Sequence, residues 1–157
     1  MASGPQGKSE EELYAFLRVL RSTTSKLPDG EYFYSCPVDF VLQEGRFFRP
    51  KPLPREIELQ PREQSFAYAQ AISAALRLRY AEGYAVNAER LPMLHAWNLD
   101  AHGFVVDATW KPPSAAYMGV VFSIKARKNV GTSLIDDWAH RWPLLRKQYK
   151  PANTQSV

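Results

Sequence analysis

The chain has 157 residues, of which 45% are apolar and 23% charged, and its formal net charge is +4. This composition is ordinary for a globular protein and shows no bias toward disorder. The single cysteine excludes an internal disulfide and a cysteine-based metal site. No apolar run approaches the roughly 18 residues that span a bilayer, and residues 1–7 lack the apolar core of a signal peptide. We therefore expect a cytoplasmic protein with no membrane partner.

The length suits one domain with a real hydrophobic core. We expect this domain to cover residues 9–150, between a disordered polar tail at 1–8 and a flexible tail at 151–157. The basic residues are scattered along the chain apart from short groups near its C-terminal end. The charge therefore permits an acidic partner without requiring one, and we do not expect dedicated binding of nucleic acid.

The first third of the chain predicts a helix followed by strands. Apolar residues recur at helical spacing from Leu13 to Leu20, which predicts a covering helix from residue 9 to about 25. Residues 31–48 are rich in Tyr, Phe and Val and predict one or two strands. Residues 49–61 carry four prolines, which indicates an extended surface segment.

A central helix is predicted from about Pro61 to Leu78, because proline suits a first helical position. Ser65, Ala69, Ile72 and Leu76 lie on one stripe at offsets of four, seven and eleven residues. Ser65 is therefore expected to face the core, close to the positive end of the helix dipole.

A strand is predicted at 80–86, followed by a hairpin formed by residues 93–100 and 104–109. A three-residue loop at 101–103 would place Trp97 opposite Asp107, so that His95 and Asp107 share a face as diagonal neighbours roughly 7–8 Å apart. A two- or four-residue loop would place them on opposite faces. Residues 117–124 predict a strand or an irregular segment, and residues 132–149 predict a short helix with a break near Pro143.

Three polar residues in apolar surroundings suggest a catalytic triad. Ser65 stands at the nucleophile position, His95 is the candidate general base, and Asp107 would hold one imidazole nitrogen. The Ser65 backbone N–H would bind the oxyanion together with an amide side chain from Gln60 or Gln64. Tyr84 and Trp97, on the adjoining strands, complete the candidate substrate-binding residues.

Each of these residues alone is more often structural than catalytic, and Cys36 is a rival nucleophile. Because Cys36 precedes Pro37, we expect it to be extended, without a helix N-terminus to activate it, and to be structural. His102 and His140 are predicted at the surface. No pair of histidines has metal-ligand spacing, so we expect no metal and no cofactor.

The ordered motifs resemble the transglutaminase-like core of the papain-like cysteine-protein superfamily, and more narrowly small bacterial and phage proteins of that type. The similar residues are Ser65 to Ala69, Arg79 to Tyr84, His95-Ala96-Trp97, Val106 to Trp110, Tyr117 to Val120 and Asp136 to Trp138. The resemblance covers roughly residues 50–145. It implies an α+β fold, an antiparallel sheet packed on a central helix, and acyl chemistry on an amide or ester.

The chain departs from this family at two positions. Ala108 replaces the usual proline, and Ser65 stands where the family has cysteine. A serine hydroxyl needs fuller assistance from a base than a thiol does. Three explanations stay open: an introduced Cys-to-Ser change, a natural inactive relative, or a true Ser-His-Asp hydrolase.

The sequence therefore predicts an enzyme that hydrolyses an amide or ester, or transfers its acyl group, with a peptide, protein or small acyl compound as substrate. The first alternative is a catalytically inactive relative that binds partners through the same cleft. The second is a binder of nucleic acid or acidic partners through the basic C-terminal segment, which a salt-dependent shift with oligonucleotides would reveal.

Overall fold

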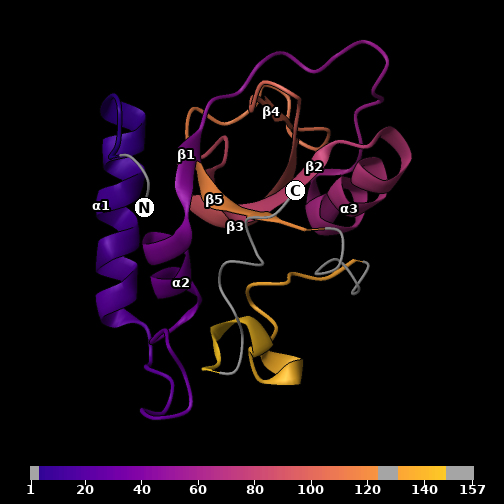
Figure 1. The fold of residues 1–157 in the computed structure, drawn as a ribbon. Coiled ribbons are helices and arrows are strands. Elements are labelled where there is room, and N and C mark those ends of the chain that lie inside the picture. The colour runs from indigo at the N-terminus through magenta and orange to yellow at the C-terminus, as the bar shows by residue number, and fades with distance from the viewer. Residues whose placement is uncertain (1–3, 124–130, 148–157) are drawn as a thin grey trace.

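The computed structural model describes residues 4–123 and 131–147. Its centre is a five-stranded antiparallel sheet with strand order β1-β5-β2-β3-β4, and the sheet curls strongly (Figure 1). The strands are β1 (Arg46–Phe48), β2 (Arg79–Val86), β3 (Pro92–Leu99), β4 (Val105–Val106) and β5 (Tyr117–Phe122). The α+β class is therefore confirmed. The predicted tail at 151–157 lies outside the described residues, as do residues 1–3 of the tail predicted at 1–8.

The two edges of the sheet meet through the segment that follows β1. Pro50 forms an isolated parallel bridge with Val105 of β4. The Val105 N–H donates to the Arg49 carbonyl at 2.8 Å, and the Lys51 N–H donates to the Val105 carbonyl at 3.2 Å. The sheet is thus almost closed, with a concave interior and a convex outer face.

Alternate residues of each strand line these two faces and form separate hydrophobic cores. The interior core consists of Phe48, Ala81, Ala85, Trp97, Leu99, Val105, Trp110, Tyr117 and Val121. The larger outer core includes Tyr80, Tyr84, Ala96, Met118, Val120 and Phe122, which pack with residues from all three helices. Strand alternation thus places the odd-numbered residues of β3, among them His95 and Trp97, in the interior.

Two paired glycines make the tight curvature of the sheet possible. Gly83 of β2 faces Gly119 of β5. A Cβ atom at Gly83 would lie 2.0 Å from the Met118 carbonyl oxygen, and one at Gly119 would lie 2.7 Å from the Trp97 ring. Side chains here would therefore push the two strands apart and displace the Trp97 ring from the interior.

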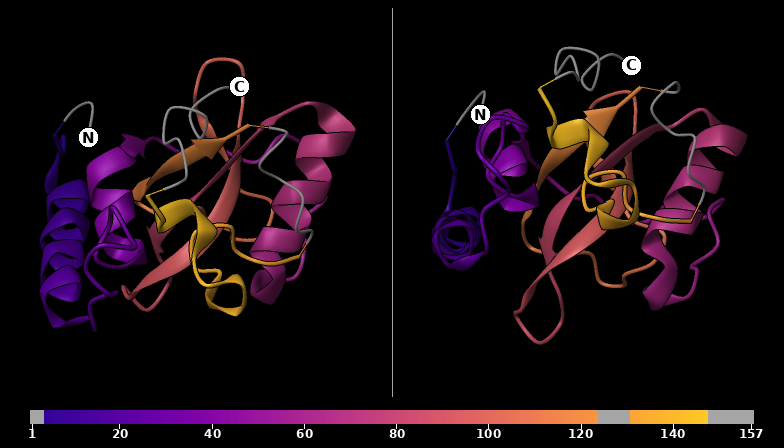
Figure 2. Two further views of the ribbon diagram at one scale, coloured as in Figure 1. Left: turned by 60° about the horizontal axis from the view of Figure 1, so that its bottom comes forward. Right: turned by 90° about the horizontal axis from the view of Figure 1, so that it is seen from below.

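Helices α1 (Lys8–Thr23) and α2 (Pro37–Glu44) lie together on one side of the sheet (Figure 2). The first agrees with the predicted helix, but the strands predicted over 31–48 are wrong except for β1. Pro37 occupies the first turn of α2, where a missing N–H costs nothing. The Asp39 carboxylate accepts a hydrogen bond from the Ser35 N–H at 2.9 Å, so local polar contacts favour a helix over a strand.

Helix α3 (Ser65–Leu76) lies against the outer face beside β2 and β3, at the opposite end of this face from α1 (Figure 2). A 3-10 turn at Arg62–Gln64 precedes it, so the predicted helix begins and ends within two to four residues of the expected bounds. Its buried residues are Ser65, Ala69, Gln70 and Ser73. Leu76 is 50% exposed, so the predicted apolar stripe is wrong at its last position.

The helix predicted over residues 132–149 is wrong. The described part of this segment contains only two short 3-10 turns, Trp138–His140 and Pro143–Leu145. The Glu82 carboxylate of β2 accepts hydrogen bonds from the backbone N–H groups of Leu134 and Ile135. These donors are held by a buried side chain, so residues 132–137 form bends on the outer face of the sheet and not a helix.

Candidate active site

The β3–β4 hairpin has the predicted register. Leu99 pairs with Val105, and the Asp100 N–H donates to the Phe104 carbonyl at 3.0 Å. The loop is therefore residues 101–103, and Gly103 adopts the positive φ of 84° that its last position requires. An odd loop keeps His95 and Asp107 on the same face, as the triad hypothesis demands.

His95 and Asp107 form a buried pair in the interior. The His95 Nε2 lies 2.8 Å from the Asp107 Oδ2, and the two residues are only 2% and 3% exposed. The predicted contact between them is confirmed. Because an ionised carboxylate can only accept, Nε2 carries the proton that it shares with Asp107. This leaves Nδ1, which has no hydrogen-bond partner among the described residues, as the nitrogen able to act as a base.

Asp107 is held by further donors besides His95. Its Oδ1 accepts the backbone N–H groups of Thr109 and Trp110 and the Thr109 hydroxyl, and its Oδ2 accepts the Tyr117 hydroxyl at 2.7 Å. Burial by itself would raise the pKa of Asp107, but the hydrogen bond and charge of His95, with the bonds from Tyr117 and Thr109, hold that pKa below its ordinary value. The same turn ends β4 at Val106, earlier than predicted.

Aromatic rings enclose the imidazole. Trp110 stacks on His95 with ring centroids 3.8 Å apart and planes 18° apart. Trp97 and Tyr117 lie on other sides, with centroid distances of 6.3 and 6.4 Å. Burial and the neighbouring charge of Asp107 raise the pKa of Tyr117, so its hydroxyl stays protonated and keeps donating. The low local dielectric strengthens the His95–Asp107 bond.

Ser65 reaches this group at an open edge of β3. If β4 continued in register, Ala96 would face Ala108. The chain turns away instead, and the Ala108 carbonyl accepts the Gln60 N–H at 2.6 Å. The Ser65 Oγ fills the vacant place, where it accepts the Ala96 N–H at 3.3 Å. The candidate nucleophile is thus 5% exposed, at the start of α3, and bonded to the residue after His95. A direct contact between its Oγ and the imidazole stays a prediction.

Of the other predicted site residues, the structure brings only some close to His95. Trp97 lies beside His95. Gln60 is near Ala108, but its side-chain amide donates to the Glu58 carbonyl at 3.1 Å. Gln64 is exposed and directly precedes Ser65. Tyr84 is not brought to the group, because it lies on the outer face and borders a cavity with Cys36 and Asp136.

Sequence reasoning did not single out Trp110 and Tyr117, which cover the pair and donate to it. The signal available for both was their place in the motifs Val106 to Trp110 and Tyr117 to Val120. An aromatic residue after a candidate orienting carboxylate could have been assigned to the wall of the site. Tyr117 could not be placed, because its distance from Asp107 depends on the pairing of β5 with β2.

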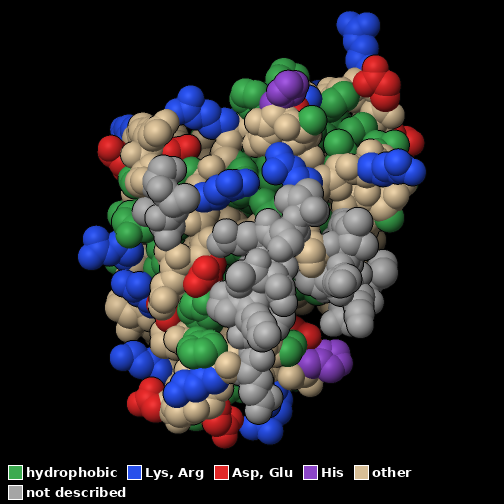
Figure 3. Space-filling view, viewed as in Figure 1, with side chains coloured by type: hydrophobic (Ala, Val, Ile, Leu, Met, Phe, Trp, Pro, Cys, Tyr) green, Lys and Arg blue, Asp and Glu red, His purple; other side chains and the backbone are tan. Residues whose placement is uncertain are grey.

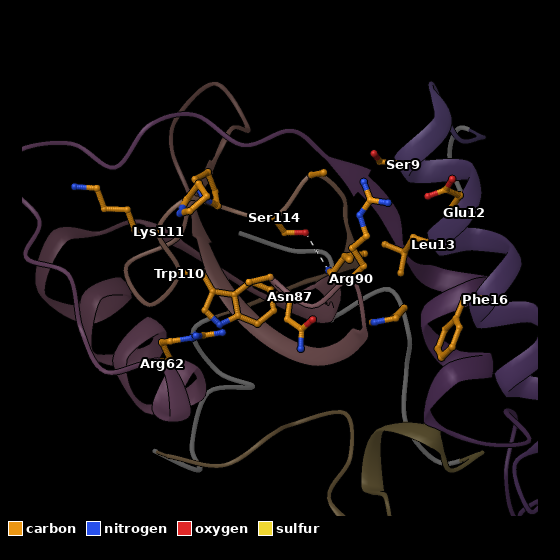
Figure 4. A pocket seen from close by; sticks show the side chains of 16 residues that line it. Ser9, Glu12, Leu13, Phe16, Arg62, Asn87, Arg90, Trp110, Lys111 and Ser114 are labelled. Carbon is orange, nitrogen blue, oxygen red and sulfur yellow. Dashed lines mark hydrogen bonds between the residues drawn. The ribbon is translucent and has the colours of Figure 1, made fainter.

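Two cavities flank the wall formed by Trp110, Lys111, Pro112 and Pro113. The first has a volume of about 380 Å³. Figure 4 shows Arg62, which precedes α3, near the Trp110 ring, with Leu13 and Phe16 of α1 across the cavity. The second has a volume of about 620 Å³ and includes Asp107 in its lining. Neither is lined by Ser65 or His95, but the second reaches the catalytic candidates at Asp107, the partner of His95.

The rival nucleophile is better placed than the sequence suggested. Cys36 is extended as predicted, with φ of −170°, but it is the N-cap of α2. The expectation that it lacks a helix N-terminus is therefore wrong. Cys36 is 1% exposed, and no hydrogen bond or ring contact links it to a histidine among the described residues.

The remaining histidines lie apart from the group. His102 is exposed in the hairpin loop, and the His140 Nδ1 lies 2.8 Å from Asp137 in the C-terminal segment. Over residues 4–123 and 131–147, no cluster of His, Cys, Asp and Glu side chains could hold a metal ion. In the same residues, no helix has the length and hydrophobicity needed to cross a bilayer.

No family model, no curated protein and no solved structure matches this chain. The resemblance to the transglutaminase-like core therefore rests on the motifs of the sequence alone, and membership of that superfamily stays a prediction.

Proposed function

We propose that this protein hydrolyses an amide or ester, or transfers its acyl group, with Ser65 as nucleophile, His95 as general base and Asp107 as the residue that orients the imidazole. The observation that carries the proposal is the buried His95–Asp107 pair, 2.8 Å apart, beside a hydroxyl at the start of α3. Because Asp107 binds the Nε2 of the imidazole, Nδ1 is left as the basic nitrogen.

The reaction would follow from these roles. The Ser65 Oγ attacks the substrate carbonyl carbon, and its proton passes to the His95 Nδ1. The carbonyl oxygen becomes an oxyanion near the N-terminal end of α3, where backbone N–H groups and the helix dipole favour negative charge. His95 then gives the proton to the leaving amine or alcohol. Water or an amine attacks the acyl-serine and loses its proton to His95. The bond between the acyl carbon and the Ser65 Oγ then breaks, and the Oγ takes the proton from His95, which releases an acid or a new amide.

The charged imidazole is the species that Asp107 would stabilise. Several hydrogen bonds keep Asp107 ionised, and its lowered pKa means that it does not take the proton from His95. The stacked Trp110 ring excludes water from the ring face of His95. The ionised Asp107 supports the role of His95 in proton transfer.

A second function is favoured by the burial of the group. Ser65 and His95 are 5% and 2% exposed, and the Ser65 hydroxyl already accepts a backbone N–H. Under this reading the chain is an inactive relative that binds a partner at the surface around Trp110. It predicts that no reagent reaches position 65.

Reaction with a fluorophosphonate, followed by mass spectrometry of the peptides, tests the proposal in the protein with Ser65 unchanged. We expect a covalent adduct on Ser65 that is absent in Ser65→Ala and in His95→Ala. The parallel test is Ser65→Cys, which should react with iodoacetamide at about pH 6 faster than free cysteine, because a helix N-terminus and an imidazolium favour the thiolate.

The matched controls separate the two functions. His95→Ala in the Ser65→Cys background should return the alkylation rate to that of an ordinary thiol. Cys36 is buried and serves as the internal reference thiol. If Ser65 takes no fluorophosphonate and the thiol introduced at position 65 is no faster than free cysteine, the enzyme proposal fails and the binding function replaces it.

A further inference from the structure

We infer that the cavity of about 620 Å³ between residues 50–59 and the Trp110–Pro113 wall binds an uncharged hydrocarbon group that the substrate carries next to its reacting carbonyl. This inference rests on the proposed function, because it names the class of substrate for the same site. The volume lies in the range of small-molecule sites, roughly 300–1,000 Å³.

The position of the cavity connects it with the catalytic group. Asp107 and Trp110 are both in its lining. Asp107 accepts the His95 Nε2 at 2.8 Å, and Trp110 stacks on the same imidazole at 3.8 Å. A ligand here would therefore contact the two residues that hold His95. The long segment from β1 to α3, seen at the top of Figure 1, forms the opposite wall and leads into Ser65.

The backbone of the wall offers few hydrogen bonds to a polar ligand. Five of its thirteen residues are prolines, which have no N–H to donate, at positions 50, 52, 54, 112 and 113. Two other backbone donors are already used: the Lys51 N–H bonds to the Val105 carbonyl, and the Ile57 N–H bonds to the Pro54 carbonyl. The wall therefore offers few hydrogen bonds to replace those that a polar ligand would lose on leaving water.

The charged side chains of the lining either bind other protein groups or are exposed to solvent. The Lys51 Nζ lies 2.6 Å from the Asp100 Oδ2, and this bond is the first of the causes that lower the pKa of Asp100 to about 2. Asp107 is saturated with donors. Arg55 and Lys111 are exposed. Leu53, Ile57 and Leu59 then provide the contact surface, which fits a hydrocarbon chain.

Calorimetric titration of the Ser65→Ala variant measures binding without turnover. The probes are acetamide, octanamide and N-octylacetamide. We expect at least one octyl compound to bind more tightly than acetamide, by about fourfold for each methylene that becomes buried. Tighter binding of octanamide would show that the hydrocarbon group belongs to the acyl part of the substrate. Tighter binding of N-octylacetamide would show that it belongs to the amine part.

Two matched variants locate the binding surface. Leu59→Gln changes a side chain of the cavity that is 47% exposed. Leu91→Gln changes one that is 60% exposed and lines none of the three cavities. We expect the first to weaken octyl binding about tenfold and the second to leave it unchanged. Ile57→Trp, which fills the cavity, should abolish the dependence on chain length while keeping the same thermal midpoint.

The outcomes distinguish this inference from the proposed function. If Leu59→Gln weakens octyl binding but Ser65 forms no fluorophosphonate adduct, the hydrocarbon site is supported and the proposed enzyme activity is not. Equal binding of acetamide and both octyl compounds would overturn the inference even if Ser65 reacts. Loss of octyl binding in Leu91→Gln to the same extent as in Leu59→Gln would also overturn it.

Discussion

Two buried carboxylates lie on opposite faces of the curled sheet, and their surroundings differ in one respect. Asp107 is in the interior and Glu82 of β2 is on the outer face, with exposures of 3% and 0%. Each accepts hydrogen bonds from backbone N–H groups, a tyrosine hydroxyl and the hydroxyl of Ser or Thr. Only Asp107 also contacts an imidazole.

The contact with His95 reverses the direction of the pKa shift. Burial raises the pKa of Glu82, and the bonds from Tyr80, Leu134, Ile135 and Ser133 do not fully offset it. At Asp107 the bonds and the charge of His95 outweigh burial and lower the pKa. Asp107 is therefore suited to stabilise an imidazolium during proton transfer, whereas Glu82 fixes residues 133–135 against the sheet.

Removal of the Glu82 carboxylate should destabilise the fold strongly. Glu82→Ala leaves the N–H groups of Leu134 and Ile135 and the Ser133 hydroxyl without their acceptor. We expect the free energy of unfolding to fall by about 3–5 kcal/mol, since each buried unpaired group costs roughly 1–3 kcal/mol. Urea denaturation measures this loss. Glu89→Ala, at an exposed position, is the control. If Glu82→Ala costs no more stability than this control, Glu82 does not hold residues 133–135 against the sheet.

Removal of the Asp107 carboxylate should cost a similar amount of stability and, in addition, all of the activity. Asp107→Ala leaves the His95 Nε2–H, the Tyr117 hydroxyl and the donors of Thr109 and Trp110 without their acceptor, for which we expect a loss of about 3–5 kcal/mol. In the Ser65→Cys background it should also remove the fast alkylation at position 65. Asp29→Ala, at an exposed turn, should change neither quantity. Fast alkylation that survives in Asp107→Ala would show that Asp107 does not orient the base.

Features that depend on residues close together in the sequence were predictable. The hairpin and its register were predictable because the three-residue loop, its terminal Gly103 and strand alternation are local features. They were sufficient to place His95 and Asp107 on one face. The start of α3 at Ser65 was also local, since Pro61 and the polar residues after it mark a helix N-terminus.

Features that depend on distant contacts were not predictable. The segment at 132–137 has helical spacing, but Glu82, more than fifty residues earlier, takes its backbone donors. Leu76 was assigned to the core, whereas Gln70 and Ser73 form the buried side of α3 because they bond to Tyr80 and the Leu78 carbonyl. Tyr84 follows the family motif, yet alternation on β2 directs it away from His95.

The two carboxylates should also give opposite dependences of stability on pH. Asp107 has a lowered pKa in the folded protein, so its contribution is present above the unfolded value of about 3.9 and is lost as the pH falls through the folded value. Glu82 has a raised pKa, so stability falls as the pH rises from about 4.3 through the folded value.

Urea midpoints between pH 3 and pH 8 test these signs. Relative to the parent protein, Glu82→Gln should become more favourable as the pH rises, because it removes the cost of ionising a buried carboxyl group. Asp107→Asn should become more favourable as the pH falls. Parallel curves for both variants would show that these two groups titrate alike in the folded and unfolded states.

The smallest expected effect concerns Ser65 and decides between a structural and a reactive hydroxyl. Ser65→Ala leaves the buried Ala96 N–H without an acceptor, but the bond is 3.3 Å long, beyond the usual range of roughly 2.7–3.2 Å. We therefore expect a loss of about 1 kcal/mol or less in urea denaturation. Ser22→Ala, whose hydroxyl donates to the Val19 carbonyl at an exposed site, gives the baseline. A loss above about 2 kcal/mol would mean that the Ser65 hydroxyl serves to complete the edge of β3. A loss near the baseline would mean that the oxygen is held loosely enough to leave Ala96 and attack a carbonyl carbon, as a nucleophile must.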